Sequence, residues 1–114
     1  MGKLEVRIGI NPISWTNDDL PQLGGDTPLE TCLSEGTEIG YVGFELGNKF
    51  PKDPAELKAK LAEYGAVVVS GWHSGNLAEG TLEDEIKAVD AHMKKLVFNG
   101  CKVMVYGEVA GSVQ

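Results

Sequence analysis

The sequence has few cysteines, few basic side chains and no long apolar run. Its two cysteines among 114 residues, Cys32 and Cys101, are too few for a disulfide scaffold and stand at no zinc-ligand spacing, so we expect buried thiols. Ten Lys and Arg against 17 Asp and Glu give a net charge of −7, which repels phosphate backbones and anionic membrane surfaces. The composition therefore argues against nucleic acid and membrane partners.

No stretch reaches the roughly 18 consecutive apolar residues of a membrane-spanning helix. The first ten residues carry charged side chains within their apolar stretch, unlike a secretory signal, and we therefore expect a cytoplasmic protein. Apolar residues make up 42% of the chain, which is enough for one modest globular domain. The 15 glycines follow no collagen-like period and indicate many tight turns.

Three stretches carry the signals of a helix start. Thr27, Asp53 and Thr81 each stand at an expected N-cap, and proline follows the first two. Glu30 stands three residues after Thr27 and would complete a capping box there. The predicted helices run over 28–39, 54–64 and 82–99, and each is followed by a glycine that suits a left-handed stop: Gly40, Gly65 and Gly100.

Apolar periodicity predicts which helix faces are buried. On the first helix the predicted buried face consists of Leu29, Cys32, Leu33, Gly36 and Ile39. On the third it consists of Leu82, Ile86, Val89, Met93, Leu96 and Val97. Gly36 is expected to allow close approach of the first helix to the sheet, whereas His92 lies off its stripe and is expected to face solvent.

Four short runs rich in β-branched residues predict strands at 6–10, 42–46, 66–71 and 101–106. Strands joined through helices become parallel neighbours by right-handed crossovers, so the fold class is α/β with the order βαβαβαβ. A (β/α)8 TIM barrel needs roughly 200 residues or more. We therefore expect residues 1–114 to form a single partial domain, the N-terminal half of such a barrel.

A small doubly wound sheet is the alternative fold. It normally carries a Gly-rich phosphate loop after its first strand, and the segment 11–15 does not resemble one. A half-barrel leaves its first and fourth strands as unpaired edges. The barrel interpretation therefore predicts self-association through the sheet edges and a chain that is a piece of a longer protein.

Polar residues stand where each predicted strand ends, which is where ligands bind in parallel α/β folds. The candidates are Asn11 and Trp15 after the first strand, Glu45, Asn48 and Lys49 at the second, Trp72 and His73 at the third, and Glu108 at the fourth. Carboxylate, amide, imidazole and indole groups together suit a small polyhydroxylated ring. No backbone anion nest is evident, which argues against a phosphorylated ligand.

Each candidate also has a structural interpretation. Glu45 lies inside an apolar strand and must either face a site or pair with another group, because a buried lone carboxylate is costly. His73 could cap backbone groups, Lys49 could be a solvated loop lysine, and both tryptophans could be core residues. The sequence contains no serine-hydrolase, zinc-protease or phosphate-loop motif.

The strings at the strand ends resemble the inosose dehydratase family of myo-inositol catabolism. They are Asn-Pro-Ile-Ser-Trp at 11–15, Phe-Glu-Leu-Gly-Asn-Lys at 44–49, Trp-His-Ser-Gly-Asn at 72–76 and Val-Tyr-Gly-Glu at 105–108. The resemblance spans essentially the whole chain. It implies a xylose-isomerase-like barrel and a lyase that dehydrates 2-keto-myo-inositol (scyllo-inosose), with a divalent metal such as manganese or cobalt and with glutathione.

The resemblance also implies roles for the strand-end residues. Glu45, His73 and Glu108 are the expected catalytic residues, and the expected substrate-binding residues are Asn11, Trp15, Asn48, Lys49 and Trp72. The metal ligands of such barrels come mainly from later strands, so we expect this chain alone to be inactive and to bind no metal. A sugar epimerase or isomerase on the same barrel and a non-catalytic half-barrel remain the alternatives.

Overall fold

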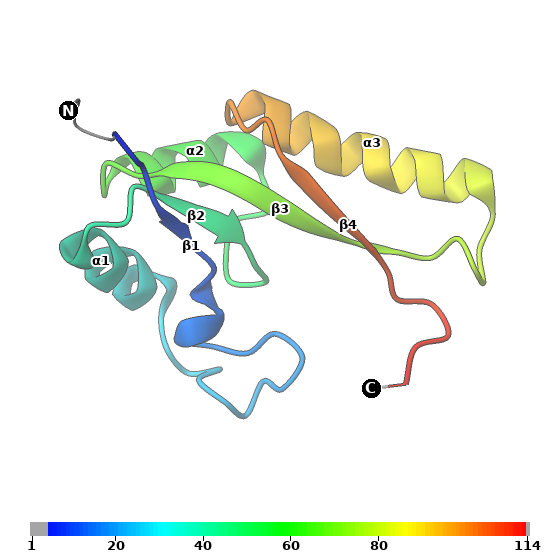
Figure 1. Ribbon diagram of the computed structural model, residues 1–114, viewed down its shortest axis with the longest axis horizontal. Coiled ribbons are helices and arrows are strands. Elements are labelled where there is room, and N and C mark those ends of the chain that lie inside the picture. The colour runs from blue at the N-terminus through cyan, green and yellow to red at the C-terminus, as the bar shows by residue number, and fades with distance from the viewer. Residues whose placement is uncertain (1–4, 114) are drawn as a thin grey trace.

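The computed structural model describes residues 5–113, so residues 1–4 and 114 of the predicted domain lie outside the described part. The elements are β1 (Gly9–Ile10), the short 3-10 helix η1 (Pro12–Ser14), α1 (Leu29–Ile39), β2 (Gly43–Leu46), α2 (Pro54–Ala62), β3 (Val67–Gly75), α3 (Leu82–Phe98) and β4 (Met104–Glu108). Over these residues the sheet has the order β1-β2-β3-β4 with every neighbouring pair parallel (Figure 1). The predicted parallel βαβαβαβ fold is confirmed, and it is consistent with half of a TIM barrel.

One apolar core joins the helices to the sheet. Phe44 of β2 is fully buried and is paired in register with Val68 of β3, so both side chains face the same side. Leucines from α1, α2 and α3 pack around them in this cluster: Leu29, Leu33, Leu57, Leu61 and Leu96. Because they share this core, α1, α2 and α3 lie on the same face of the sheet.

Gly36 brings α1 close to the sheet, as predicted. A Cβ built at Gly36 would lie 2.7 Å from Cζ of Phe44, so any larger side chain would push the helix outward. The two thiols are free and buried, as predicted, and burial raises the pKa of Cys32. No helix within the described residues is both long and apolar enough to cross a bilayer.

Two of the three predicted helix caps are confirmed. The Asp53 carboxylate accepts from the N–H groups of Ala55 and Glu56, and the Thr81 hydroxyl accepts from Asp84 N–H. The predicted capping box at Thr27 is wrong, because Pro28 takes the N-cap position with an extended ψ of 150° and makes no side-chain cap bond. The stop after α1 is as predicted, with Gly40 left-handed at φ 119°.

The strands differ from prediction in length. β1 has only two residues, whereas β3 continues past residue 71 to Gly75 because 71–75 pair with β4. β4 begins at Met104 instead of residue 101, since Cys101 N–H bonds back to Leu96 C=O and completes the end of α3. Trp72 and His73 therefore belong to a strand and not to a loop.

The predicted buried face of α3 is largely wrong. Of its apolar stripe only Leu96 is buried, and the exposed members are Leu82, Ile86, Met93 and Val97. Ile39 of α1 is likewise 69% exposed. The apolar stripe points away from β3 because polar side chains, Glu85 foremost, fill the side of α3 that faces the sheet.

Candidate functional site

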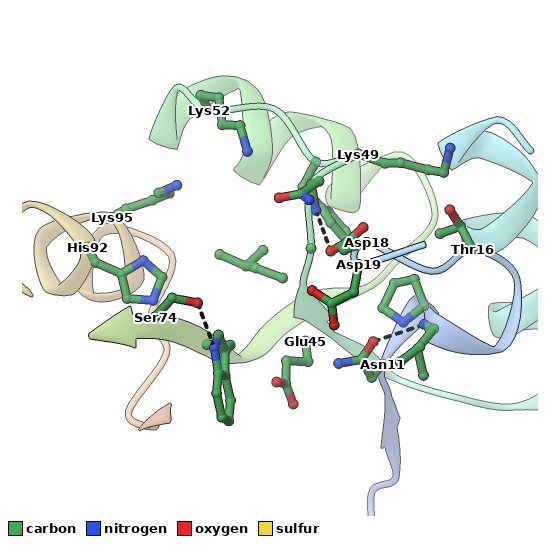
Figure 2. A pocket seen from close by; sticks show the side chains of 17 residues that line it. Asn11, Thr16, Asp18, Asp19, Glu45, Lys49, Lys52, Ser74, His92 and Lys95 are labelled. Atoms are coloured by element: carbon green, nitrogen blue, oxygen red, sulfur yellow. Dashed lines mark hydrogen bonds between the residues drawn. The ribbon is translucent and has the colours of Figure 1, made fainter. Parts of the chain in front are cut away.

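The described part of the chain contains a cavity of about 430 Å³ at the carboxyl end of β2 (Figure 2). β2 ends at Leu46 while β3 continues, so the loops after β1 and β2 and the far part of β3 surround an open space. Of the predicted site residues, this cavity brings together Asn11, Glu45, Asn48, Lys49 and Trp72. It leaves out Trp15, His73 and Glu108.

Glu45 is the ionisable group of β2 in this cavity. Glu45 directly follows the core residue Phe44 along β2, so strand alternation puts its side chain on the opposite face of the sheet. Glu45 Oε2 accepts a hydrogen bond of 3.0 Å from the Ser70 hydroxyl of β3, its partner in register. The carboxylate is thus held in place by one neutral donor and keeps its remaining lone pairs for a ligand.

The loops after β1 and β2 are tied together across the cavity. Asp18 Oδ2 accepts from the Asn48 N–H at 3.0 Å, and a Cβ on Gly47 would lie 2.9 Å from the same oxygen. Asn11 Oδ1 accepts from the Ile13 N–H at 2.9 Å, which leaves the Asn11 amide NH₂ available. Sequence reasoning missed Asp18 and its neighbour Asp19, whose signal was two adjacent carboxylates directly after the Asn-Pro-Ile-Ser-Trp string.

Trp72 and Ser74 lie on the same face of β3, and both line the cavity. The indole Nε1 donates to Ser74 Oγ at 3.0 Å, which fixes the orientation of the ring. Gly107 of β4 lies directly against the indole, where a Cβ would overlap it. The ring can therefore serve as a rigid apolar wall.

His73 lies between Trp72 and Ser74, so its side chain points to the other face of β3, toward α3. Its Nε2 is 2.7 Å from Glu85 Oε1, and Glu85 Oε2 accepts from the Asn76 N–H at 3.0 Å. The bond to His73 lowers the pKa of Glu85, with the Asn76 N–H adding to this. The structure thus places His73 in a contact between strand and helix, outside the cavity that contains Glu45.

Glu108 is also placed away from the cavity. Glu108 pairs in register with Gly75 of β3, whereas Glu45 pairs with Ser70. These two positions of β3 are five residues apart, which is about 16 Å along a strand. Its carboxylate accepts from the Leu77 N–H at 2.8 Å and from the Tyr106 hydroxyl at 3.2 Å. Partial burial and the neighbouring Glu108 raise the pKa of Tyr106 to about 12. Asn11, Glu45, His73 and Glu108 thus all stand toward the carboxyl ends of their strands, and of these four the cavity is lined by Asn11 and Glu45.

Two further predicted residues have structural contacts. Trp15 Nε1 donates to Glu35 of α1 at 2.6 Å, so its indole packs on that helix and not on the cavity. Lys49 lines the cavity, but its ammonium group donates to the Gly25 carbonyl at 2.8 Å. That bond holds the 24–28 turn against the loop that follows β2.

His92 was expected to face solvent, and this prediction is wrong. Its ring lies against Gly71 of β3, where a Cβ would come within 2.9 Å of Nε2, and Nε2 is buried without a hydrogen-bond partner. Burial lowers the pKa of His92, and the facing Gly71 backbone partly offsets this. His92 lines the cavity together with Lys52 and Lys95, which sequence reasoning also missed.

Metal ligands do not gather in this part of the protein. Within residues 5–113, no three side chains of His, Cys, Asp and Glu come together closely enough to hold a metal ion. Asp18 and Glu45 line the same cavity, but each already accepts one hydrogen bond. The donors described here therefore do not fit a manganese or cobalt ion on their own.

No family model matches the chain, but proteins of known name do. It is 47% identical over 107 residues to the rhizopine catabolism protein MocC of Rhizobium meliloti, covering 94% of this chain and 33% of that protein. It is 43% identical over 110 residues to an inosose dehydratase of Geobacillus thermodenitrificans, covering 96% and 37%. The chain thus spans about a third of the length of these relatives. They confirm the predicted resemblance to the inosose dehydratase family.

Proposed function

We propose that this chain, a homologue of inosose dehydratases over nearly its whole length, forms part of a hydro-lyase that acts on a polyhydroxylated cyclic ketone, 2-keto-myo-inositol. The observation that carries the proposal is the cavity beside β2, where Glu45 lies among amide, hydroxyl and indole groups. Its volume of about 430 Å³ is in the range of small-molecule sites. Such a lining suits a ring that is polar at its edge and apolar on its faces.

The roles follow from what each group can do. Trp72 offers its indole plane to the C–H face of the ring, and the amides of Asn11 and Asn48 hydrogen-bond to ring hydroxyls. Elimination of water beside a ketone needs a base for the acidic α-proton and an acid for the departing hydroxyl. Glu45 takes one of these two roles, with Ser70 holding its carboxylate in position.

His73, Glu108 and Trp15 contact no ligand in this proposal, because each is engaged outside the cavity. His73 acts instead as a positioning residue. Its bond to Glu85 fixes the stretch of β3 that carries Trp72 and Ser74 on the opposite face. Lys49 keeps its contact with the Gly25 carbonyl and shapes the rim of the cavity.

The cofactors implied by the resemblance, a divalent metal and glutathione, are part of the proposal for the whole protein. We place the metal ligands outside the stretch described here, and no step above runs through a metal. The cytoplasmic location expected from the sequence also stays a prediction.

Self-association of this chain is part of the same proposal. Within the described residues β1 and β4 are the sheet edges, each with one side unpaired. The exposed apolar stripe of α3 shares surface grooves with Met104 and Tyr106 of β4. Unpaired edges and exposed apolar surface both favour contact with a second copy, so sedimentation velocity should detect a dimer or a larger species.

The proposed function is tested by titrating the chain with 2-keto-myo-inositol and following tryptophan fluorescence and calorimetric heat. We expect saturable binding that Trp72→Ala and Asn48→Ala weaken by about tenfold each, the loss of about 1.4 kcal/mol per contact. Trp15→Phe removes the other tryptophan, which contacts α1 and not the cavity, and should leave binding unchanged. No dehydration product is expected from this chain alone.

Four results would contradict the proposal in different ways. Absence of saturable binding would remove the cavity as a ketone site. Equal loss of binding in the Trp15 and Trp72 variants would mean that the effect is structural. Dehydration by this chain alone would place the complete catalytic machinery among the residues described here, whereas conversion to an epimer would favour the isomerase alternative.

A further inference from the structure

The cavity has two chemically different ends. Figure 2 shows Lys52, His92 and Lys95 on one side of it, and Asn11 with the carboxylates Asp18, Asp19 and Glu45 on the other. The basic end combines the loop after β2, which carries Lys52, with α3, which carries the other two. No sequence motif joins these residues, because they are brought together only by the packing of α3 on β3.

Among residues 5–113, neither Lys52 nor Lys95 forms an ion pair with a carboxylate. The ion pairs formed by the described residues involve Lys60, His73 and Lys94, and they include neither Lys52 nor Lys95. Burial lowers the pKa of Lys95, and the nearby charge of Lys52 lowers it further. The two ammonium groups therefore repel each other, although the chain as a whole has a net charge of −7.

His92 supplies a second, independent observation. Buried polar atoms are nearly always hydrogen-bonded, and His92 Nε2 is the buried side-chain nitrogen without a partner among the described residues. Figure 2 shows its ring directed from α3 toward the cavity. Nε2 itself packs on the Gly71 backbone and is buried from the cavity, so a ligand at this end would lie beside the His92 ring and reach the ammonium groups of Lys52 and Lys95.

We propose that Lys52, His92 and Lys95 form a binding site for a small oxyanion, a carboxylate or a phosphate group. Ammonium groups make strong charge-assisted hydrogen bonds to such oxygens, and a bound anion relieves the repulsion between Lys52 and Lys95. The carboxylates at the other end repel an anion there, so it binds in one location and one orientation. This site is independent of the proposed dehydratase activity and needs no ketone.

The experiment titrates the chain separately with inorganic phosphate and with acetate at one pH, keeping ionic strength constant with sodium chloride. Binding is followed by NMR of the His92 and His73 ring protons. We expect a saturable shift at His92 and little change at His73, which already bonds to Glu85. The stronger of the two anions identifies the source as a phosphate or a carboxylate.

Two neighbouring lysines make a matched pair of variants. Lys95→Gln should weaken anion binding by about tenfold, whereas Lys94→Gln, which removes an exposed lysine paired with Asp90, should have no effect. Lys95→Arg keeps the charge and should retain binding, which separates loss of the site from loss of the fold. Equal affinity in the two Gln variants, or shifts that chloride alone reproduces, would overturn the proposal.

Discussion

The two halves of the molecule are held together in different ways. Around β2, α1 and α2 the contacts are apolar, and the fully buried side chains Phe44, Leu33, Leu57, Leu61 and Cys32 all belong to this half. Where β3 and β4 meet α3, Leu96 is the buried apolar residue of the helix, and Glu85 with its bonds to His73 and Asn76 joins helix and strand. The free energy gained by burying apolar side chains depends neither on pH nor on bond angles, whereas the strength of these polar bonds depends on both.

The two halves also contribute differently, one to the stability of the fold and the other to the placement of the cavity residues. The apolar half contains the largest fully buried side chains and so should dominate the free energy of unfolding. The polar half carries Trp72 and Ser74 on one face of β3 and the bond from His73 to Glu85 on the other.

The largest effect is expected from Phe44→Ala in the apolar half. Phe44 is fully buried and packs against Gly36, so removing its ring leaves a cavity among the surrounding leucines. We expect a loss of about 3–5 kcal/mol in the free energy of unfolding, measured by urea denaturation.

Ile39→Ala is the control for Phe44→Ala, because this residue of α1 is 69% exposed and should change stability by less than about 0.5 kcal/mol. Similar losses in the two variants would mean that the exposed end of α1 is covered in solution. The apolar half would then include an interface in addition to its core.

A smaller and pH-dependent effect is expected from Glu85→Gln in the polar half. The bond to His73 lowers the pKa of Glu85 in the folded state, so the ionised carboxylate stabilises the fold above its unfolded pKa of about 4.3. This contribution is lost as pH falls through the lower folded pKa. The urea midpoint of the wild type should therefore exceed that of the variant at about pH 6 and approach it at about pH 3.

Glu83→Gln tests whether that pH dependence belongs to the specific bond. Glu83 and Glu85 both lie in the first turn of α3 and both favour the helix dipole, but Glu83 is exposed. Its variant should follow the wild-type pH profile. If the two variants behaved alike, the stabilisation would come from the helix terminus and not from the contact between Glu85 and His73.

Local chemistry explains which parts of the fold were predictable from sequence. Asp53, Thr81 and Gly40 act within one or two turns of their own backbone, and all three behave as predicted. The burial of α3 was not predictable in this way, because it depends on the side of the helix that meets β3. Gly71 leaves room there for His92, and the apolar stripe faces outward.

The candidate site residues were likewise predictable where their position depends on the local sequence alone. Asn11, Glu45, Asn48 and Lys49 end or follow their strands as predicted, and the cavity contains all four. The ligand-facing positions of β3 depend on where that strand ends. Because β3 extends to Gly75, its residues alternate between faces, and alternation places Trp72 in the cavity and His73 outside it.

The smallest effect contrasts two threonines that the sequence marks in the same way. The Thr81 hydroxyl accepts from Asp84 N–H at 3.2 Å at the start of α3, whereas α1 has Pro28 at its N-cap and no side-chain cap bond. Thr81→Ala should therefore reduce the free energy of unfolding by about 1 kcal/mol, and Thr27→Ala by much less. Urea denaturation of both variants, with Thr81→Ser restoring the hydroxyl, checks this directly. An equal loss at Thr27 would show that its hydroxyl caps α1 in solution. Side-chain capping would then stabilise a helix of the apolar half as well.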